Sequence, residues 1–244
     1  MDRASSDAAT TVIFRTPLGP RLISLFAVAA LAATGALTTA LAVVLLVNRQ
    51  WVLGALVVAP MACFIAGLTG YVWRDLRGKW GLRVSMTERS LILDLPGGRS
   101  LIHRPPERHV EIPYAEIAAI EARLEAYGSL GLEMMQRAYV LHRRNGELIF
   151  LCEDRAIATP YAGAPFAPVA AAIAERADVP LRDLGMVEGR GGFLGVWGAR
   201  AADWAATPLT LAQQLRIWRA VAITGALPIP VIVIAMLLRG LLSG

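Results

Sequence analysis

The chain has 244 residues, of which 56% are hydrophobic and 18% are charged. Globular proteins have about a quarter of their residues charged, so this chain is apolar for a globular protein. Two cysteines are too few for a disulfide framework. The net charge is +5, but the segment Arg74–Arg219 is nearly neutral, with 19 Lys and Arg against 17 Asp and Glu. The charge pattern therefore does not indicate nucleic-acid binding, which would gather basic residues on one face of the domain.

Two long apolar runs come first, Leu22–Val47 and Trp51–Trp73, and neither contains a charged residue. A membrane core about 30 Å thick needs about 20 apolar residues in a helix. We therefore predict a transmembrane helical hairpin over residues 22–73, preceded by a short polar tail over 1–21. The alternatives are two core helices of a soluble protein, or a signal peptide cleaved near Ala40.

A third apolar run, Ala220–Leu238, is just long enough to span. We predict that its helix begins at Leu211, capped by Thr210, and ends at Arg239. Pro228 and Pro230 would kink it. The alternative is a segment that re-enters the membrane or lies on its surface.

Basic and aromatic side chains flank these runs, as they do at membrane interfaces. Their placement predicts a bacterial inner-membrane protein with its N-terminus and central domain in the cytoplasm and its C-terminus in the periplasm. The predicted interface residues are Trp51, Tyr71, Trp73, Arg74, Arg77, Lys79, Trp80, Arg216, Trp218 and Arg219.

The central segment has the alternation of half-buried strands. Residues 82–87 and 91–95 form one predicted hairpin. Residues 115–127 fit either a helix or a strand, and residues 128–135 are predicted to be a loop. A helix is predicted from Pro165 to Ala177, with Phe166, Val169 and Ile173 on its buried face.

Asn145-Gly146 predicts a second hairpin with a two-residue turn. In that register His142 pairs with Ile149, and Leu141 with Phe150. Tyr139, Leu141, Leu148, Phe150 and Cys152 then share the core face. Cys152 and His142 lie on opposite faces, so they are not expected to form a catalytic pair.

The loop after residue 98 is rich in cations and prolines. We predict either a site for an anion or partner or a solvated loop offset by Glu107 and Glu111. The candidate site residues are Arg99, His103, Arg104 and Arg108.

Residues 180–210 are glycine-rich and are predicted to be an irregular connector. Its apolar residues Phe193, Leu194, Trp197 and Trp204 would pack on the domain, rest on the membrane or form a partner patch. No motif in the chain predicts a catalytic, cofactor or metal site.

Residues 86–93, Ile112-Pro113-Tyr114-Ala115-Glu116-Ile117, the Asn-Gly hairpin and the closing helix together resemble the bacterial pleckstrin-homology-like domain of small membrane proteins. The resemblance covers residues 80–179 and favours a strand over 115–127. It implies an α+β protein: three transmembrane helices and a cytoplasmic antiparallel β-sandwich or open barrel, capped by one helix. Phosphoinositide-binding members use basic residues at the first hairpin loop, where this chain offers only Arg89 beside Glu88.

These observations predict a non-enzymatic protein of the lipid bilayer that docks a protein partner or forms a homo-oligomer, with no cofactor and no nucleic acid. Two alternatives are a module that responds to lipids or anions, and an assembly factor for a photosynthetic or other membrane complex, as some membrane-bound relatives of the resembled family are.

Overall fold

The computed structural model describes residues 12–48, 52–100, 102–129, 132–155, 166–192 and 198–226. The protein is α+β, with two apolar helices and two four-stranded sheets. Its chain divides into two compact units, Met1–Glu116 and Ile117–Gly244. The boundary falls inside residues 80–179, which the resemblance assigned to a single domain.

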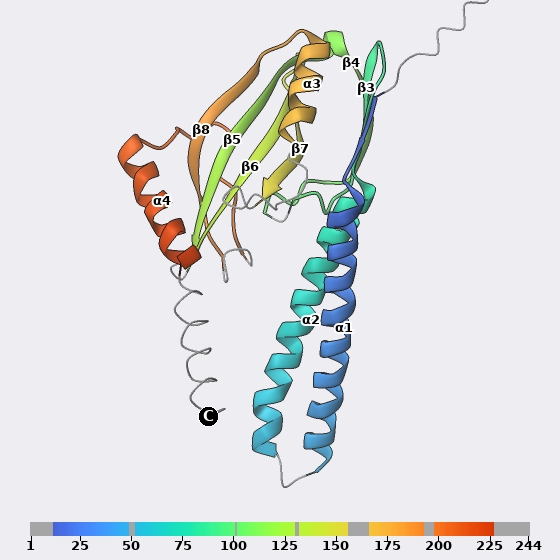
Figure 1. Ribbon diagram of the computed structural model, residues 1–244, viewed down its shortest axis with the longest axis vertical. Coiled ribbons are helices and arrows are strands. Elements are labelled where there is room, and N and C mark those ends of the chain that lie inside the picture. The colour runs from blue at the N-terminus through green and yellow to red at the C-terminus, as the bar shows by residue number, and fades with distance from the viewer. Residues whose placement is uncertain are drawn as a thin grey trace, which may run out of the picture. The chain divides into compact units, whose positions relative to one another are not determined.

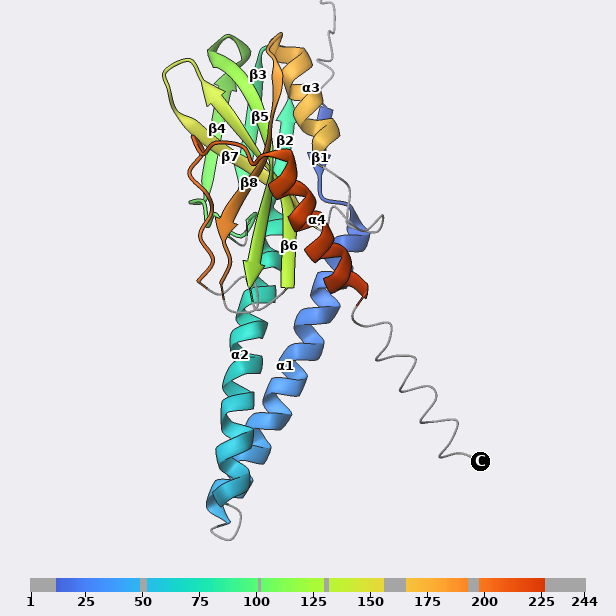
Figure 2. The ribbon, with the colours of Figure 1, turned by 90° about the vertical axis from the view of Figure 1, so that its left-hand side faces the viewer.

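The first unit contains the helical hairpin of α1 (Leu18–Val47) and α2 (Val52–Gly81), 30 residues each. The two helices run side by side in both ribbon views (Figures 1 and 2). A Cβ added to Gly35 would lie 3.3 Å from Ile65 Cγ2, so glycine lets the helices approach closely here. Both helices are long and apolar enough to cross a membrane. Helix α2 extends eight residues beyond Trp73, through the charged residues that follow the apolar run.

Sheet A consists of β1 (Val12–Arg15), β2 (Arg83–Met86), β3 (Ser90–Leu95) and β4 (Arg108–Pro113), antiparallel and in that order. A short 3₁₀ turn, η2 (Tyr114–Glu116), follows. The segment 1–21, predicted to be a short polar tail, contains β1, which pairs with β2, and the first turn of α1. The helical hairpin of α1 and α2 is therefore an insertion between the neighbouring strands β1 and β2. Only residues 16–17 and 82 join it to them.

Sheet B lies in the second unit, in the order β7-β6-β5-β8. Its strands are β5 (Ile117–Ser129), β6 (Leu132–Arg143), β7 (Leu148–Arg155) and β8 (Leu181–Arg190). The segment with ambiguous periodicity is strand β5, as predicted, and it has a partner on each side. The prediction of a loop over 128–135 is wrong for residues 128–129 and 132–135, because Gly128 pairs with Glu133 and Ser129 with Leu132. The prediction of an irregular connector over 180–210 is also wrong for residues 181–190, which form β8 parallel to β5.

The Asn-Gly hairpin of β6 and β7 forms, but near its turn the strands pair one residue out of the predicted register. Leu141 pairs with Ile149 and His142 with Leu148, because the turn contains an extra residue before Gly146, whose φ is 87°. An irregularity between Tyr139 and Val140 restores the predicted pair Tyr139–Cys152. Ile149 and Leu151 are therefore the buried residues of β7, whereas Leu148 is 47% exposed.

Two helices complete the second unit. Helix α3 (Ala167–Ala177) buries Val169, Ala170 and Ile173, and Phe166 just before it packs on Tyr139 with ring centroids 5.4 Å apart. Helix α4 (Leu211–Ala226) begins at the predicted residue. Its Ile217 packs with Ala126, Met135 and Met186 of sheet B, and Val221 packs against the same cluster. The predicted third span is therefore in part a helix docked on a sheet, and residues 227–239 lie outside the described residues.

Candidate functional site

Arg99, the first residue of the predicted anion loop, serves the backbone of that loop. Its side chain is 5% exposed, and Nη1 donates to the carbonyl oxygens of Leu95 (3.0 Å), Pro96 (2.9 Å) and Pro106 (2.8 Å). A guanidinium held by three carbonyls closes the loop and is not presented to an outside anion. Arg99 therefore has a structural role in the loop, and its Nη1 is taken up by the three carbonyl oxygens.

The other three candidates of the loop occupy different environments. The backbone N–H of His103 donates to Ser100 Oγ at 3.0 Å, and His103 is half-buried. Arg104 is exposed and has a φ of 46°. Arg108 is the first residue of β4, opposite Leu95. The loop thus connects β3 to β4, and the buried Arg99 binds its backbone.

The polar end of the helical hairpin is the first place where ionisable groups gather. Asp75 is 8% exposed and binds Lys79 Nζ at 2.8 Å, one turn along α2. Lys79 also donates to Ser24 Oγ of α1 at 2.7 Å. The Arg74 guanidinium donates to the carbonyl oxygens of Gly97 (3.2 Å) and Ser100 (3.3 Å), so the β3–β4 loop is fastened to α2.

Several predicted interface residues lie at this end of the hairpin. Trp73 is 50% exposed and Trp80 is 46% exposed, while the Arg21 guanidinium lies 5.7 Å from the centre of the Trp80 ring. Arg77 is exposed. Trp51, at the other end, is outside the described residues.

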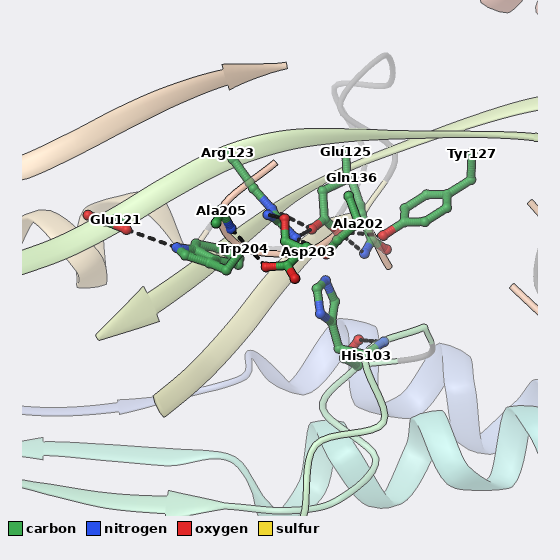
Figure 3. Close-up of polar contacts among 11 residues, drawn as sticks. His103, Glu121, Arg123, Glu125, Tyr127, Gln136, Ala202, Asp203, Trp204 and Ala205 are labelled. Carbon is green, nitrogen blue, oxygen red and sulfur yellow. Dashed lines mark hydrogen bonds and ion pairs between the residues drawn. The ribbon is translucent and has the colours of Figure 1, made fainter. Parts of the chain in front are cut away.

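Sheet B carries a buried polar network that follows one face of β5 (Figure 3). Glu125 is fully buried and accepts hydrogen bonds from Arg123 Nε (2.8 Å), the Tyr127 hydroxyl (2.7 Å) and Gln136 Nε2 (2.9 Å). Arg123 is itself fully buried. Three donors, one of them the cationic guanidinium of Arg123, therefore satisfy the buried carboxylate of Glu125.

The same arginine binds the returning chain after β8. Arg123 Nη1 and Nη2 donate to the carbonyl oxygens of Asp203 (2.6 Å) and Ala202 (2.8 Å), and its guanidinium stacks over the Trp204 ring at 3.9 Å (Figure 3). Trp204 Nε1 donates to Glu121 Oε2 at 2.8 Å. Of the predicted partner patch, Trp204 therefore packs on its own unit, while Phe193, Leu194 and Trp197 are outside the described residues.

Glu121, 7% exposed, continues this network toward His142 and Arg182. His142 Nε2 lies 2.6 Å from Glu121 Oε2, within ion-pair distance but without hydrogen-bond geometry. Arg182 Nη1 lies 3.6 Å from Glu121 Oε1. The alternation of Glu121, Arg123 and Glu125 indicated a strand, but it did not reveal the network, because Gln136 and the residues 202–204 come from distant parts of the chain.

Burial changes the acid–base properties of two tyrosines. Desolvation, then the charge of Glu125 and the hydrogen bond to it, raises the pKa of Tyr127 far above its usual range. Desolvation and the hydrogen bond to Asp154 do the same to the pKa of Tyr139. Burial also raises the pKa of Asp154, which accepts hydrogen bonds from the Tyr139 hydroxyl (2.8 Å) and the Phe166 backbone. Both phenols therefore act as hydrogen-bond donors at neutral pH.

Cys152 and His142 lie on opposite faces of sheet B, since Cys152 pairs with Tyr139 and His142 follows it by three residues on β6. Within the described ranges, no group of three or more His, Cys, Asp and Glu side chains could hold a metal ion.

Helix α4 is apolar on two faces. Ile217 and Val221 pack on sheet B, while Leu211, Leu215 and Trp218 are 72%, 49% and 39% exposed. Arg216 and Arg219, two predicted interface residues, are exposed on the same helix.

Comparisons with models of protein families, with curated proteins and with solved structures find no match for this chain.

Proposed function

We propose that this chain is a non-enzymatic protein of the bacterial inner membrane, whose β units dock a protein partner or a second copy of the chain. The N-terminus and both sheets would face the cytoplasm. The role would be that of an anchored scaffold.

The observation that carries this proposal is the insertion of the apolar hairpin between β1 and β2. Only residues 16–17 and 82 join α1 and α2 to sheet A. A hairpin inserted in a bilayer therefore cannot be separated from the sheet by a flexible linker. Sheet A would stay at the membrane surface, as suits a scaffold that acts on membrane-bound partners.

The polar groups of sheet B support a role in binding over one in catalysis. Catalysis needs a nucleophile, a base and an orienting group that converge on substrate. Glu125, Arg123 and Tyr127 instead bind one another and the chain at residues 202–203. Their contacts are those of a network that maintains the fold.

Membrane insertion is tested by fractionation of cells expressing the full chain. We expect the protein to stay in the membrane pellet after extraction with alkaline carbonate, and to dissolve only in detergent. A reporter fused after Gly146 should be active in the cytoplasm. Release by carbonate, or a periplasmic signal from that reporter, would contradict the proposal.

Docking is tested with a photo-reactive amino acid at Leu148, Leu181 or Leu215, which are exposed apolar residues on β7, β8 and α4. We expect an adduct of defined mass from at least one site in living cells, either twice the chain mass or the sum with one partner. Exposed Glu175 on α3 is the control position. Monomer alone at all three sites, together with a monomer after gentle solubilisation, would overturn the docking role.

A further inference from the structure

Two arginines face each other where sheet A meets the hairpin. Arg15 is the last residue of β1, and Arg83 is the first residue of β2, its Cα partner. Side chains directly opposite in an antiparallel pair share one face, with Cβ atoms about 4.5–5.5 Å apart, and like charges there repel. On the other side Arg83 is opposite Asp94, but the ion pair of Asp94 is with His109 on β4.

A third arginine, Arg21, lies in the first turn of α1. Its guanidinium is positioned over Trp80, three residues before Arg83. The Nε atoms of Arg21 and Arg83 are shielded from solvent, and neither has a hydrogen-bond partner in the described part of the chain. Shielded donors without an acceptor are uncommon in folded proteins and call for an ion or ligand. A repelling pair and two unsatisfied guanidinium donors thus point to a bound anion.

The place of this cluster identifies the chemistry of the anion. Arg21 directly precedes the uncharged stretch 22–47, and Trp73 and Trp80 are about half exposed on α2 beside it. Tryptophan and arginine at the end of an apolar helix lie at the headgroup level of a bilayer. The one nearby acid on α2, Asp75, is paired with Lys79. The planar donors of arginine match the oxygens of a phosphate diester.

We propose that Arg15, Arg21 and Arg83 form a site for the phosphate of an anionic phospholipid headgroup, such as that of phosphatidylglycerol. This inference rests on the membrane insertion proposed above. It differs from the site predicted in the β3–β4 loop, since Arg99 of that loop serves three carbonyls. It also differs from the first hairpin loop, at the other end of β2 and β3, where Arg89 lies.

The site is tested with the full chain in a neutral detergent, using native mass spectrometry and thermal unfolding. The probes are short-chain phosphatidylglycerol, short-chain phosphatidylcholine and glycerol 1-phosphate. The variants are Arg15→Gln and Arg83→Gln, with Arg89→Gln as the control that removes the same charge from an exposed position in the β2–β3 loop.

We expect phosphatidylglycerol to bind and to raise the unfolding temperature, whereas phosphatidylcholine and glycerol 1-phosphate do not at equal concentration. Losing one charge-assisted hydrogen bond corresponds to roughly tenfold weaker binding, so Arg15→Gln and Arg83→Gln should each weaken it by about that factor or more. Arg89→Gln should stay within about twofold of the unmodified chain.

Equal weakening by all three variants would overturn the site, because it would show only general attraction to positive charge. Equal binding of phosphatidylcholine would overturn the preference for an anion. Equal binding of glycerol 1-phosphate would overturn the lipid as the ligand. These measurements are made in detergent, so they can fail while carbonate extraction still shows an inserted protein, and the two proposals are tested separately.

Discussion

Arginine side chains lie in two contrasting environments in this molecule. In one the guanidinium has a full set of partners, and in the other two guanidinium groups face each other. In sheet B, Arg123 is fully buried with Glu125, two carbonyl oxygens and the Trp204 ring around its guanidinium. At the hairpin end of sheet A, Arg15 faces Arg83, and the Nε of Arg83 has no acceptor among the described residues. A satisfied guanidinium holds the backbone together, whereas a repelling pair costs stability unless an anion binds between its members.

The largest effect should come from breaking the satisfied arginine. Arg123→Met leaves Glu125 buried without its cation and frees the chain at residues 202–203. Removing one partner of a buried pair costs about 3–5 kcal/mol. We expect a loss of that size in the opening free energy of β5, measured by hydrogen exchange on the full chain in detergent.

A matched control for this change is Arg137→Met on the neighbouring strand β6. Arg137 Nη2 lies 3.6 Å from Asp183, and their side chains are 38% and 57% exposed. Exposed pairs contribute about 0–1 kcal/mol, so this variant should differ little from the unmodified chain. Equal losses in the two variants would mean that the network around Glu125 is not what makes Arg123 important.

In the first unit, close backbone contact between α2 and the β3–β4 loop takes the structural role that ion pairs have in sheet B. A Cβ added to Gly78 of α2 would lie 2.3 Å from the carbonyl oxygen of Gly98, which the backbone cannot accept without moving. Gly78→Ala should therefore destabilise the chain by about 1–3 kcal/mol, the cost of overpacking, and should expose the β3–β4 loop to proteases. The measurement is thermal unfolding in detergent combined with limited proteolysis.

Gly70→Ala on the same helix is the control, since a Cβ there meets nothing within 4 Å. Alanine is the better helix former by roughly 0.5–1 kcal/mol, so this variant should be neutral or slightly more stable. A similar loss at both positions would show that the helix itself, not the contact with Gly98, is sensitive to substitution.

Local pattern was enough to predict the hairpin helices, strands β2 and β3, the Asn-Gly hairpin and helix α3. It failed where a segment depends on a distant partner. Strand β1 has four residues, and its partner β2 comes only after the whole hairpin of residues 18–81. The glycines of β8 predict a connector, and its pairing with β5 is not visible in the local sequence.

The functional residues were harder to predict than the elements. Composition marked Arg99 as a candidate for anion binding, but three carbonyl oxygens of its own loop surround it. Arg15 and Arg83 are 68 positions apart in sequence, and only the pairing of β1 with β2 makes them neighbours. The Glu125 network was hidden for the same reason, because its ligands come from β6 and from residues 202–204.

The buried tyrosines of sheet B should make the stability of the second unit depend on pH. Burial raises the pKa of Tyr127 and Tyr139 above the value near 10 that they have in the unfolded chain. Above that pH the unfolded chain loses phenolic protons that the folded chain keeps, so unfolding becomes more favourable. Each such tyrosine should lower the stability by up to about 1.4 kcal/mol per pH unit above pH 10, and have no effect below it.

Absorbance of the phenolate and denaturant unfolding between pH 9 and 11 check this prediction. Only part of the five tyrosines should titrate near pH 10 in the folded chain. Tyr127→Phe should make the loss of stability with pH less steep, whatever its effect at neutral pH. A full titration of all five near pH 10 in folded protein would contradict the burial of these two side chains.

The smallest effect should have the opposite sign. In neutral detergent without anionic lipid, Arg15→Gln removes one of two like charges that face each other across β1 and β2. Relief of such a pair should stabilise the chain by about 0.2–1 kcal/mol, and added salt should reduce the gain through screening. Arg83→Gln in the Arg15→Gln background should gain less than it does alone, because the repulsion has already been removed. Thermal unfolding of the four proteins, repeated with phosphatidylglycerol, measures this coupling. If phosphatidylglycerol reverses the sign of the coupling energy, the two arginines share a ligand. If Arg15→Gln destabilises the chain without lipid, the two arginines do not repel each other. In that case there is no repulsion for a bound anion to relieve.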